Sequence, residues 1–241
     1  GADFIVALGG GSSIDTAKGI GIVVNNPDFA DVKSLEGVAA TRHKAVPTFA
    51  LPTTAGTAAE VTINYVIIDE DAKKKMVCVD PNDIPVVAIV DPELMVSIPP
   101  HLTAYQGFDA FFHAAEGFIA NCATPISDLY ALEAIRLIYK YLPVAVADGK
   151  NLKARAKIAW ASTLAGMVEA TSSCTSEHSL EHAMSAYYPQ LPHGAGLIAL
   201  SEAYFETFRH DCTKRYMKMA EMMTQLGGIT DSMSQSVTAG D

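Results

Sequence analysis

Disulfide frameworks, basic patches and long apolar runs are all missing from this sequence of 241 residues. Its four cysteines are scattered without a Cys-x-x-Cys pair, which indicates free thiols in a reducing cytoplasm rather than disulfides. Lysine and arginine total 17 against 27 acidic residues, and a net charge of −10 argues against nucleic-acid binding. No uninterrupted apolar stretch reaches the length of about 18 residues that a membrane span requires. We therefore expect a cytoplasmic protein that binds neither nucleic acid nor membrane.

Two kinds of hydrophobic pattern divide the chain near residue 98. Before Pro99 and Pro100, short apolar runs predict strands at 4–8, 45–51, 61–68, 76–79 and 85–90. After them, helical periodicity predicts helices at 102–122, 125–140, 152–170, 175–187, 194–208 and 211–226. Pro143, Gly149 and Pro189 fall between these predicted helices. The sequence therefore predicts an α/β domain over residues 1–98 and an all-helical domain over residues 99–241.

A glycine-rich turn follows the first predicted strand. Gly9, Gly10, Gly11 and Ser12 lead into a helix predicted over 16–24, and such a turn lets backbone N–H groups approach a phosphate closely. The spacing is not Gly-x-Gly-x-x-Gly, so a tight strand-to-helix turn without any ligand is the competing interpretation. Asp15 either favours the helix dipole in the first turn or faces a ligand cleft.

A second loop of small and hydroxyl-bearing residues, 52–57, follows the strand predicted at 45–51. Loops at the carboxyl ends of parallel strands line the ligand crevice of α/β sheets. Two such loops favour a nucleotide site more strongly than either loop alone, because their hydroxyl groups can bind phosphate or ribose. A well-satisfied turn without a ligand is again the alternative.

Five side chains with metal-binding atoms follow in the second half. Asp109 and His113 are four residues apart, as are His178 and His182, so each pair lies on one helical face. His193 adds a donor where a loop meets a helix. Imidazole and carboxylate suit Fe(II), Zn(II), Mn(II) or Co(II), and burying Asp109 among phenylalanines without a partner would cost several kcal/mol. The pattern predicts a metal site with four protein ligands drawn from these five residues.

The competing interpretation is that each histidine is an ordinary packed or surface residue, as a single histidine on a helix usually is. We assign that role to His43, His101 and His210, which lie in charged or loop contexts. Cys174 stands four residues before His178 and could be an auxiliary ligand, but we expect it to be a small, packed residue of a helix.

Four segments resemble the iron-containing (group III) alcohol dehydrogenases, and together they span residues 1 to about 226. They are Gly-Gly-Gly-Ser-Ser-Ile-Asp-Thr-Ala-Lys at 9–18, Pro-Thr-Thr-Ala-Gly-Thr-Ala-Ala-Glu-Val-Thr at 52–62, Gly-Phe-Asp-Ala-Phe-Phe-His-Ala-Ala-Glu at 107–116 and Leu-Pro-His-Gly at 191–194. The resemblance implies a Rossmann-like dinucleotide-binding domain, an all-α metal-binding domain and a cleft between them. Family members are longer, so we expect a fragment whose first domain is incomplete at its N-terminus and whose second is partial at its C-terminus.

The resemblance also implies roles for individual residues. By motif, the metal ligands are Asp109, His113, His178 and His193, and His182 is a non-ligand that relays protons. If the register slips between His182 and His193, His182 would be the ligand instead of His178. The residues that the resemblance places at the cofactor are Gly10, Gly11, Ser12, Asp15, Thr53, Thr54, Thr57, Asn64 and Lys75. The metal is expected to be Fe²⁺, with Zn²⁺ possible, and the cofactor to be NAD or NADP.

The function implied is hydride transfer between a nicotinamide cofactor and a small primary alcohol, aldehyde or diol, in a homodimer or a higher homo-oligomer. One alternative is a zinc polyol dehydrogenase similar to glycerol dehydrogenase, which uses fewer of these ligands. A second alternative, from a different class, is a truncated metal-binding fragment without catalytic activity.

Overall fold

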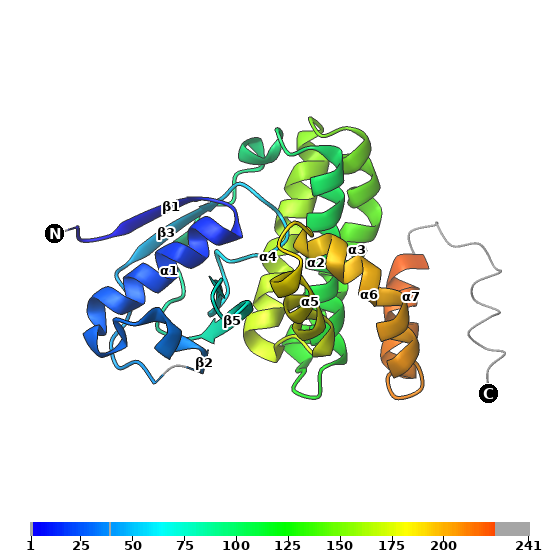
Figure 1. Ribbon diagram of the computed structural model, residues 1–241. Coiled ribbons are helices and arrows are strands. Elements are labelled where there is room, and N and C mark those ends of the chain that lie inside the picture. The colour runs from blue at the N-terminus through cyan, green and yellow to red at the C-terminus, as the bar shows by residue number, and fades with distance from the viewer. Residues whose placement is uncertain (1, 39, 225–241) are drawn as a thin grey trace.

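The computed structural model describes residues 2–38 and 40–224, and it divides into an α/β part and a helical part that lie side by side (Figure 1). The three-stranded parallel sheet of the first part contains β1 (Ile5–Gly9), β3 (Thr48–Pro52) and β6 (Val87–Ala88), in the order β1-β3-β6. Helix α1 (Gly11–Asn25) packs on one face of this sheet. The other face carries exposed apolar side chains, among them Val6 and Leu8, because successive side chains of a strand point to opposite faces.

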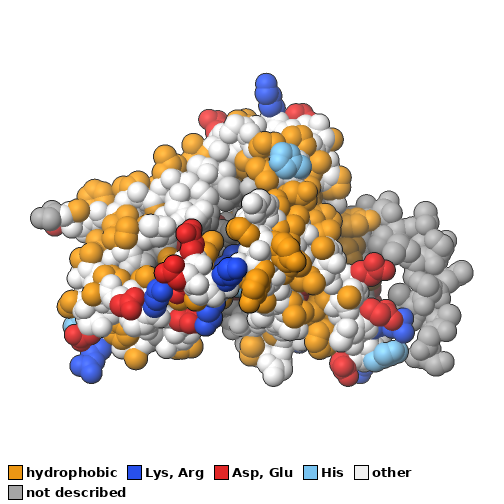
Figure 2. Space-filling view, viewed as in Figure 1, with side chains coloured by type: hydrophobic (Ala, Val, Ile, Leu, Met, Phe, Trp, Pro, Cys, Tyr) orange, Lys and Arg blue, Asp and Glu red, His pale blue; other side chains and the backbone are white. Residues whose placement is uncertain are grey.

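A second small sheet lies below the first one in this view. Strands β4 (Asn64–Asp69) and β5 (Lys74–Val79) form an antiparallel hairpin, and β2 (Gly37–Val38) pairs with β5. Short 3₁₀ helices occupy Pro27–Phe29, Val32–Leu35 and Pro92–Met95. Charged side chains of both signs gather over this region on the face shown in Figure 2, where Lys33 pairs with Asp69 and Lys74 pairs with Glu36.

The helical part is built on three long helices, α2 (Pro100–Ile119), α3 (Pro125–Ala147) and α4 (Leu152–Ser172). Their shared core is rich in alanine, and small side chains let helix axes approach closely. Thr124 and Ser127 form a capping box at the start of α3, which stabilises that helix end. Three shorter helices follow: α5 (Ser176–Tyr187), α6 (His193–Phe208) and α7 (Thr213–Thr224). Within the described residues, no helix is long and apolar enough to cross a membrane.

The structure corrects several predicted boundaries. Pro143 was expected between helices but lies inside α3, which continues to Ala147. A proline in a helix interior costs about 3 kcal/mol, but the flanking Leu142 and Ala145 are buried in the helical core, and their packing favours the longer helix. Helix α1 begins directly at Gly11 rather than at residue 16, and the predicted strand 61–68 begins only at Asn64. Residues 225 and 226 of the last predicted helix lie outside the described part of the chain.

Candidate metal and cofactor site

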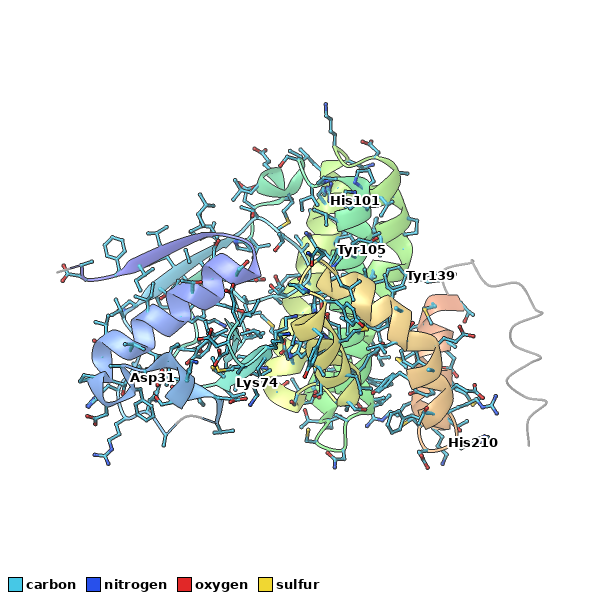
Figure 3. All side chains as sticks on the ribbon, in the orientation of Figure 1. Asp31, Lys74, His101, Tyr105, Tyr139 and His210 are labelled. Carbon is cyan, nitrogen blue, oxygen red and sulfur yellow. The ribbon has the colours of Figure 1, made fainter. Side chains whose placement is uncertain are left out.

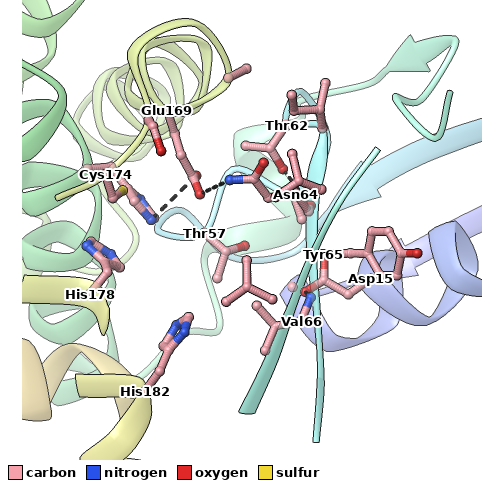
Figure 4. Close-up of a pocket in the computed structure, with 18 of the residues that line it drawn as sticks. Asp15, Thr57, Thr62, Asn64, Tyr65, Val66, Glu169, Cys174, His178 and His182 are labelled. Atoms are coloured by element: carbon pink, nitrogen blue, oxygen red, sulfur yellow. Dashed lines mark hydrogen bonds and ion pairs between the residues drawn. The ribbon is translucent and has the colours of Figure 1, made fainter. Parts of the chain in front are cut away.

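A cavity of about 540 Å³ separates the two parts (Figure 4). Its walls come from the start of α1, from the β4–β5 hairpin, from the end of α4 and the loop after it, and from α5. Elements that are distant in the sequence therefore contribute to one site. Figure 4 shows His178 and Cys174 on one side of this cavity, and Asp15, Tyr65 and Val66 on the other.

Four of the five predicted metal-binding residues converge at the helical side of the cavity. Asp109 Oδ1 lies 3.4 Å from Nε2 of His178 and 3.4 Å from Nε2 of His193. The same oxygen lies 3.8 Å from Nε2 of His113, one helical turn further along α2. Asp109, His113 and His178 are all buried, whereas the His193 side chain is 25% exposed.

The electrostatics of this cluster fit a cation. Burial opposes ionisation of Asp109, but the neighbouring His113 and His193 hold the pKa of its carboxyl well below the usual range. A buried carboxylate facing three imidazole nitrogens at 3.4 to 3.8 Å is the donor set that divalent transition metals prefer. The residues present therefore fit an iron or zinc ion.

Two further carboxylates form hydrogen bonds with Nδ1 of the imidazole rings, on the side away from Asp109. Glu116 on α2 accepts a hydrogen bond from Nδ1 of His178, and from the backbone N–H of Thr175 at 2.8 Å. Glu181 on α5 accepts one from Nδ1 of His193 and pairs with Lys75 Nζ at 3.3 Å. Both carboxylate side chains have zero exposure. A hydrogen bond at Nδ1 fixes the ring tautomer and leaves Nε2 free to bind a metal.

Glu116 and Glu181 were missed from the sequence, although a signal was present. Glu116 stands three residues after His113 and seven after Asp109, so all three share one face of α2. Glu181 stands three residues after His178. An acidic residue on the face of a buried helix that carries metal ligands therefore predicts a carboxylate that hydrogen-bonds to a ligand histidine.

His182 lies beside this cluster rather than inside it. Its ring centroid is 6.4 Å from that of His178 and 5.4 Å from that of His193. Burial, together with the positive charges of Lys75 and His193, lowers the pKa of His182 to about 3. The ring is therefore uncharged at neutral pH.

Cys174 differs from its prediction as a packed helix residue. It lies in the loop between α4 and α5, and its Sγ is within 4.8 Å of ring nitrogens of His113 and His178. Burial raises the pKa of this thiol to about 12, so it stays protonated. The three remaining histidines are exposed as expected, and Figure 3 shows His101 and His210 at distant ends of the helical part.

The two loops predicted to bind the cofactor lie against each other. A Cβ on Gly10 would stand 3.1 Å from Thr54 Cγ2, and a Cβ on Gly11 would stand 2.9 Å from Thr57 Cγ2, so larger residues would separate the loops. Six of the predicted cofactor residues line the cavity: Gly11, Ser12, Asp15, Thr57, Asn64 and Lys75. The other three, Gly10, Thr53 and Thr54, are not part of the cavity wall but belong to these two loops.

Polar side chains of α1, the helix that follows the glycine turn, form hydrogen bonds with the β4–β5 hairpin and the residues that lead into it. Asp15 accepts a hydrogen bond from the backbone N–H of Val66 at 3.0 Å, and burial raises its pKa to about 6. Lys18, a residue that sequence reasoning left without a role, is fully buried and donates to the carbonyl oxygens of Thr62 and Asn64 at 2.6 and 2.8 Å. These bonds fix the entry of β4 and therefore the position of Asn64 in the cavity wall.

A glycine turn and a carboxylate–imidazole cluster thus face one cavity between an α/β part and a helical part. This architecture is typical of metal-dependent oxidoreductases that use a nucleotide cofactor. The chain belongs to the iron-containing alcohol dehydrogenase family. Residues 1–92 match the model of the iron-containing alcohol dehydrogenases, and residues 103–239 match that of the family's C-terminal part.

Individual relatives agree with this assignment. The chain is 48% identical over 224 residues to lactaldehyde reductase of Escherichia coli (strain K12), a match that covers 92% of this chain and 58% of that protein. An alcohol dehydrogenase structure from Oenococcus oeni superposes with a TM-score of 0.90 at 37% identity, covering 99% of this chain and 62% of that one. A sulfoacetaldehyde reductase from Bifidobacterium kashiwanohense, solved in complex with NAD+, superposes with a TM-score of 0.79 at 30% identity, covering 99% and 69%. The chain thus spans about three fifths of the length of the first two relatives.

Proposed function

We propose that this chain forms the cofactor and metal site of an alcohol dehydrogenase that also works as an aldehyde reductase. It transfers a hydride between NAD or NADP and a small primary alcohol or aldehyde. The observation that carries this proposal is that the three histidines of the cluster, which surround Asp109, line the same cavity as the N-terminus of α1. Separate sites would support only binding, whereas a shared cavity can hold a cofactor and a substrate within reach of each other.

In this proposal Asp109, His113, His178 and His193 hold the metal, Fe²⁺ or Zn²⁺. A bound metal supplies Lewis-acid polarisation of the substrate oxygen. His178 is preferred over His182 as the third imidazole because its Nε2 lies 3.4 Å from Asp109 Oδ1. His182 belongs instead to a neighbouring group with Glu181 and His193.

The chain's own residues then have distinct tasks. The backbone N–H groups at the start of α1 bind the cofactor's phosphates, and Glu116 and Glu181 keep the ligand rings oriented. His182, uncharged and facing the cavity, passes a proton between the substrate oxygen and solvent by accepting at one ring nitrogen and donating from the other. The apolar wall of Val66 and Val77 keeps water from the reacting atoms.

The experiment combines elemental analysis of the anaerobically purified chain with an NADH-linked assay on a short aldehyde. About one metal per chain with turnover supports the proposal. Metal without turnover reduces it to the binding fragment considered above, and no uptake of iron or zinc refutes the metal site.

Two variants separate the roles of the histidines. His193→Ala is expected to lose metal and activity together. His182→Ala is expected to keep its metal and to lose about 10²-fold in rate, the usual contribution of a positioned acid–base group. A His193→Ala protein with full metal content and full activity would contradict the ligand assignment.

A further inference from the structure

Helix α4 places one carboxylate in the cavity that the proposed mechanism does not use. Glu169 lines the cavity between the metal cluster and the hairpin, and its side chain is 14% exposed. Its Oε1 accepts a hydrogen bond from Asn64 Nδ2 at 2.7 Å, while Oε2 lies 3.6 Å from Nε2 of His113 (Figure 4). One oxygen is thus fixed by the hairpin, and the other faces the metal cluster.

Among the described residues, the ion-pair partner of Glu169 is His113, which carries a charge only when it is protonated. Within the described residues no lysine or arginine forms an ion pair with it, whereas Glu116 and Glu181 each hold a ligand ring. Of the buried positions near it on α4, Ala165 and Val168 are apolar and Ser172 is polar. An apolar side chain at 169 would fill this wall without the cost of desolvating a carboxylate. One oxygen of Glu169 accepts a hydrogen bond from Asn64 and the other accepts none from the described residues. Because this carboxylate lines the cavity in which we place the substrate, it indicates a role in substrate recognition.

Glu169 is badly placed to be a fifth metal ligand. Among the described residues, three groups of donor atoms lie within 4.8 Å of one another; each of the four proposed ligands belongs to at least one of these groups, and Glu169 belongs to none. The bond to Asn64 holds its carboxylate toward the cofactor wall instead. Its other oxygen, Oε2, lies beside the metal cluster on the wall of the cavity in which we place the substrate.

We propose that Glu169 is a specificity-determining residue that accepts a hydrogen bond from a second hydroxyl group of the substrate. This inference rests on the proposed dehydrogenase function. A site built to bind a hydroxyl group discriminates strongly against an analogue that lacks it, because the buried acceptor is then left unpaired. The same carboxylate repels substrates that carry an anionic group next to the reacting carbon. The substrate class is therefore a short, uncharged diol or hydroxyaldehyde.

Three alcohols with the same carbon count test this proposal: propane-1,2-diol, propan-1-ol and 3-hydroxypropanoate. The wild-type chain should have its highest kcat/KM for the diol. Glu169→Leu removes the acceptor and the charge, so the ratio of diol to propan-1-ol should fall by at least about tenfold, the usual effect of one lost charge-assisted hydrogen bond. Glu169→Gln removes only the charge, so the kcat/KM for 3-hydroxypropanoate should rise about tenfold or more. Glu202→Gln, at an exposed position of α6 that is not part of the cavity wall, is the matched control and should leave both ratios unchanged.

Each outcome separates the inference from the function that it rests on. A wild-type chain that oxidises none of the three alcohols overturns the dehydrogenase proposal and this inference with it. Turnover with unchanged ratios in both variants overturns the role of Glu169 alone. Metal content is measured in parallel, and loss of metal in Glu169→Gln would make this residue part of the metal site instead. If Glu169→Leu fails to fold, the test rests on the kcat/KM of Glu169→Gln for 3-hydroxypropanoate: a rise supports the proposed role of Glu169, and an unchanged value contradicts it.

Discussion

Removing the charge of Glu181 should weaken metal binding without removing any metal ligand. The carboxylate accepts a hydrogen bond from Nδ1 of His193 and lies 3.3 Å from Lys75 Nζ, with zero side-chain exposure. In Glu181→Gln the amide oxygen can still accept from the ring, but the negative charge that makes the imidazole a stronger donor is lost. Lys75 also loses its counter-ion, and its positive charge then acts on the metal without compensation.

The magnitude follows from this geometry. Losing a carboxylate that orients a metal-binding histidine typically costs 10- to 100-fold in metal affinity, or about 1.4 to 2.7 kcal/mol. The exposed fraction of zero argues for the upper half of that range, because solvent does not screen the lost charge. The dissociation constants for Fe²⁺ and Zn²⁺ are measured by competition with a chelator of known affinity.

Glu177 offers a control on the same helix. It is as buried as Glu181, and its carboxylate oxygens have no hydrogen-bond partner among the described residues. Burial raises its pKa to about 8, so it is largely protonated at neutral pH and glutamine copies it closely. Glu177→Gln should therefore leave the metal affinity unchanged. The reasoning is refuted if Glu181→Gln binds metal as tightly as the wild type, or if Glu177→Gln weakens binding equally.

Two further predictions concern stability. Gly194→Ala would place a Cβ 2.1 Å from the backbone oxygen of Tyr105, so the free energy of unfolding measured in urea should fall by about 2 kcal/mol or more. In Gly19→Ala the new Cβ would lie 3.7 Å from Tyr65, an ordinary contact distance, so the free energy of unfolding should rise by up to about 1 kcal/mol. Equal losses of stability in both variants would contradict the packing argument. The raised pKa of Glu177 means that the folded state holds this proton more tightly than the unfolded state, so its contribution is full below the ordinary value of 4.5 and is lost as the pH rises through about 8. The melting temperature of Glu177→Gln should therefore exceed that of the wild type more at about pH 8.5 than at about pH 5, and a gain confined to the acidic side would show the opposite linkage.

The order of strands and helices was readable from the sequence because each element has a strong local signal. The apolar run before Gly9 and the helical periodicity after Pro100 are both local patterns, and both match the structure. Pro143 was misread because its local preference is to end a helix, while the packing of Leu142 and Ala145 against other helices is a tertiary effect. Boundaries depend on such contacts, and a single sequence does not display them.

The site shows the same division. The spacing of four residues predicted that Asp109 and His113 share one face of a helix, and in the structure both residues lie on one face of α2. The interactions that tune the cluster join distant segments: Glu116 reaches His178 across 62 residues, and Asn64 reaches Glu169 across 105. The low pKa of His182 arises in part from Lys75, which is on another element of the fold. No periodic pattern carries that information.

Two of these long-range contacts join the hairpin to the helical part. Glu169 on α4 binds Asn64 at the start of β4, and Glu181 on α5 pairs with Lys75 on β5. Each carboxylate also lies next to a ring of the metal cluster, namely His113 or His193. A displacement of the hairpin when a cofactor binds would therefore act on both rings. By linkage, any gain in metal affinity from the cofactor must equal the gain in cofactor affinity from the metal. The metal dissociation constant measured with and without NAD on the wild type and on Glu181→Gln tests this link, because the coupling should shrink in the variant that has lost the bridge to Lys75.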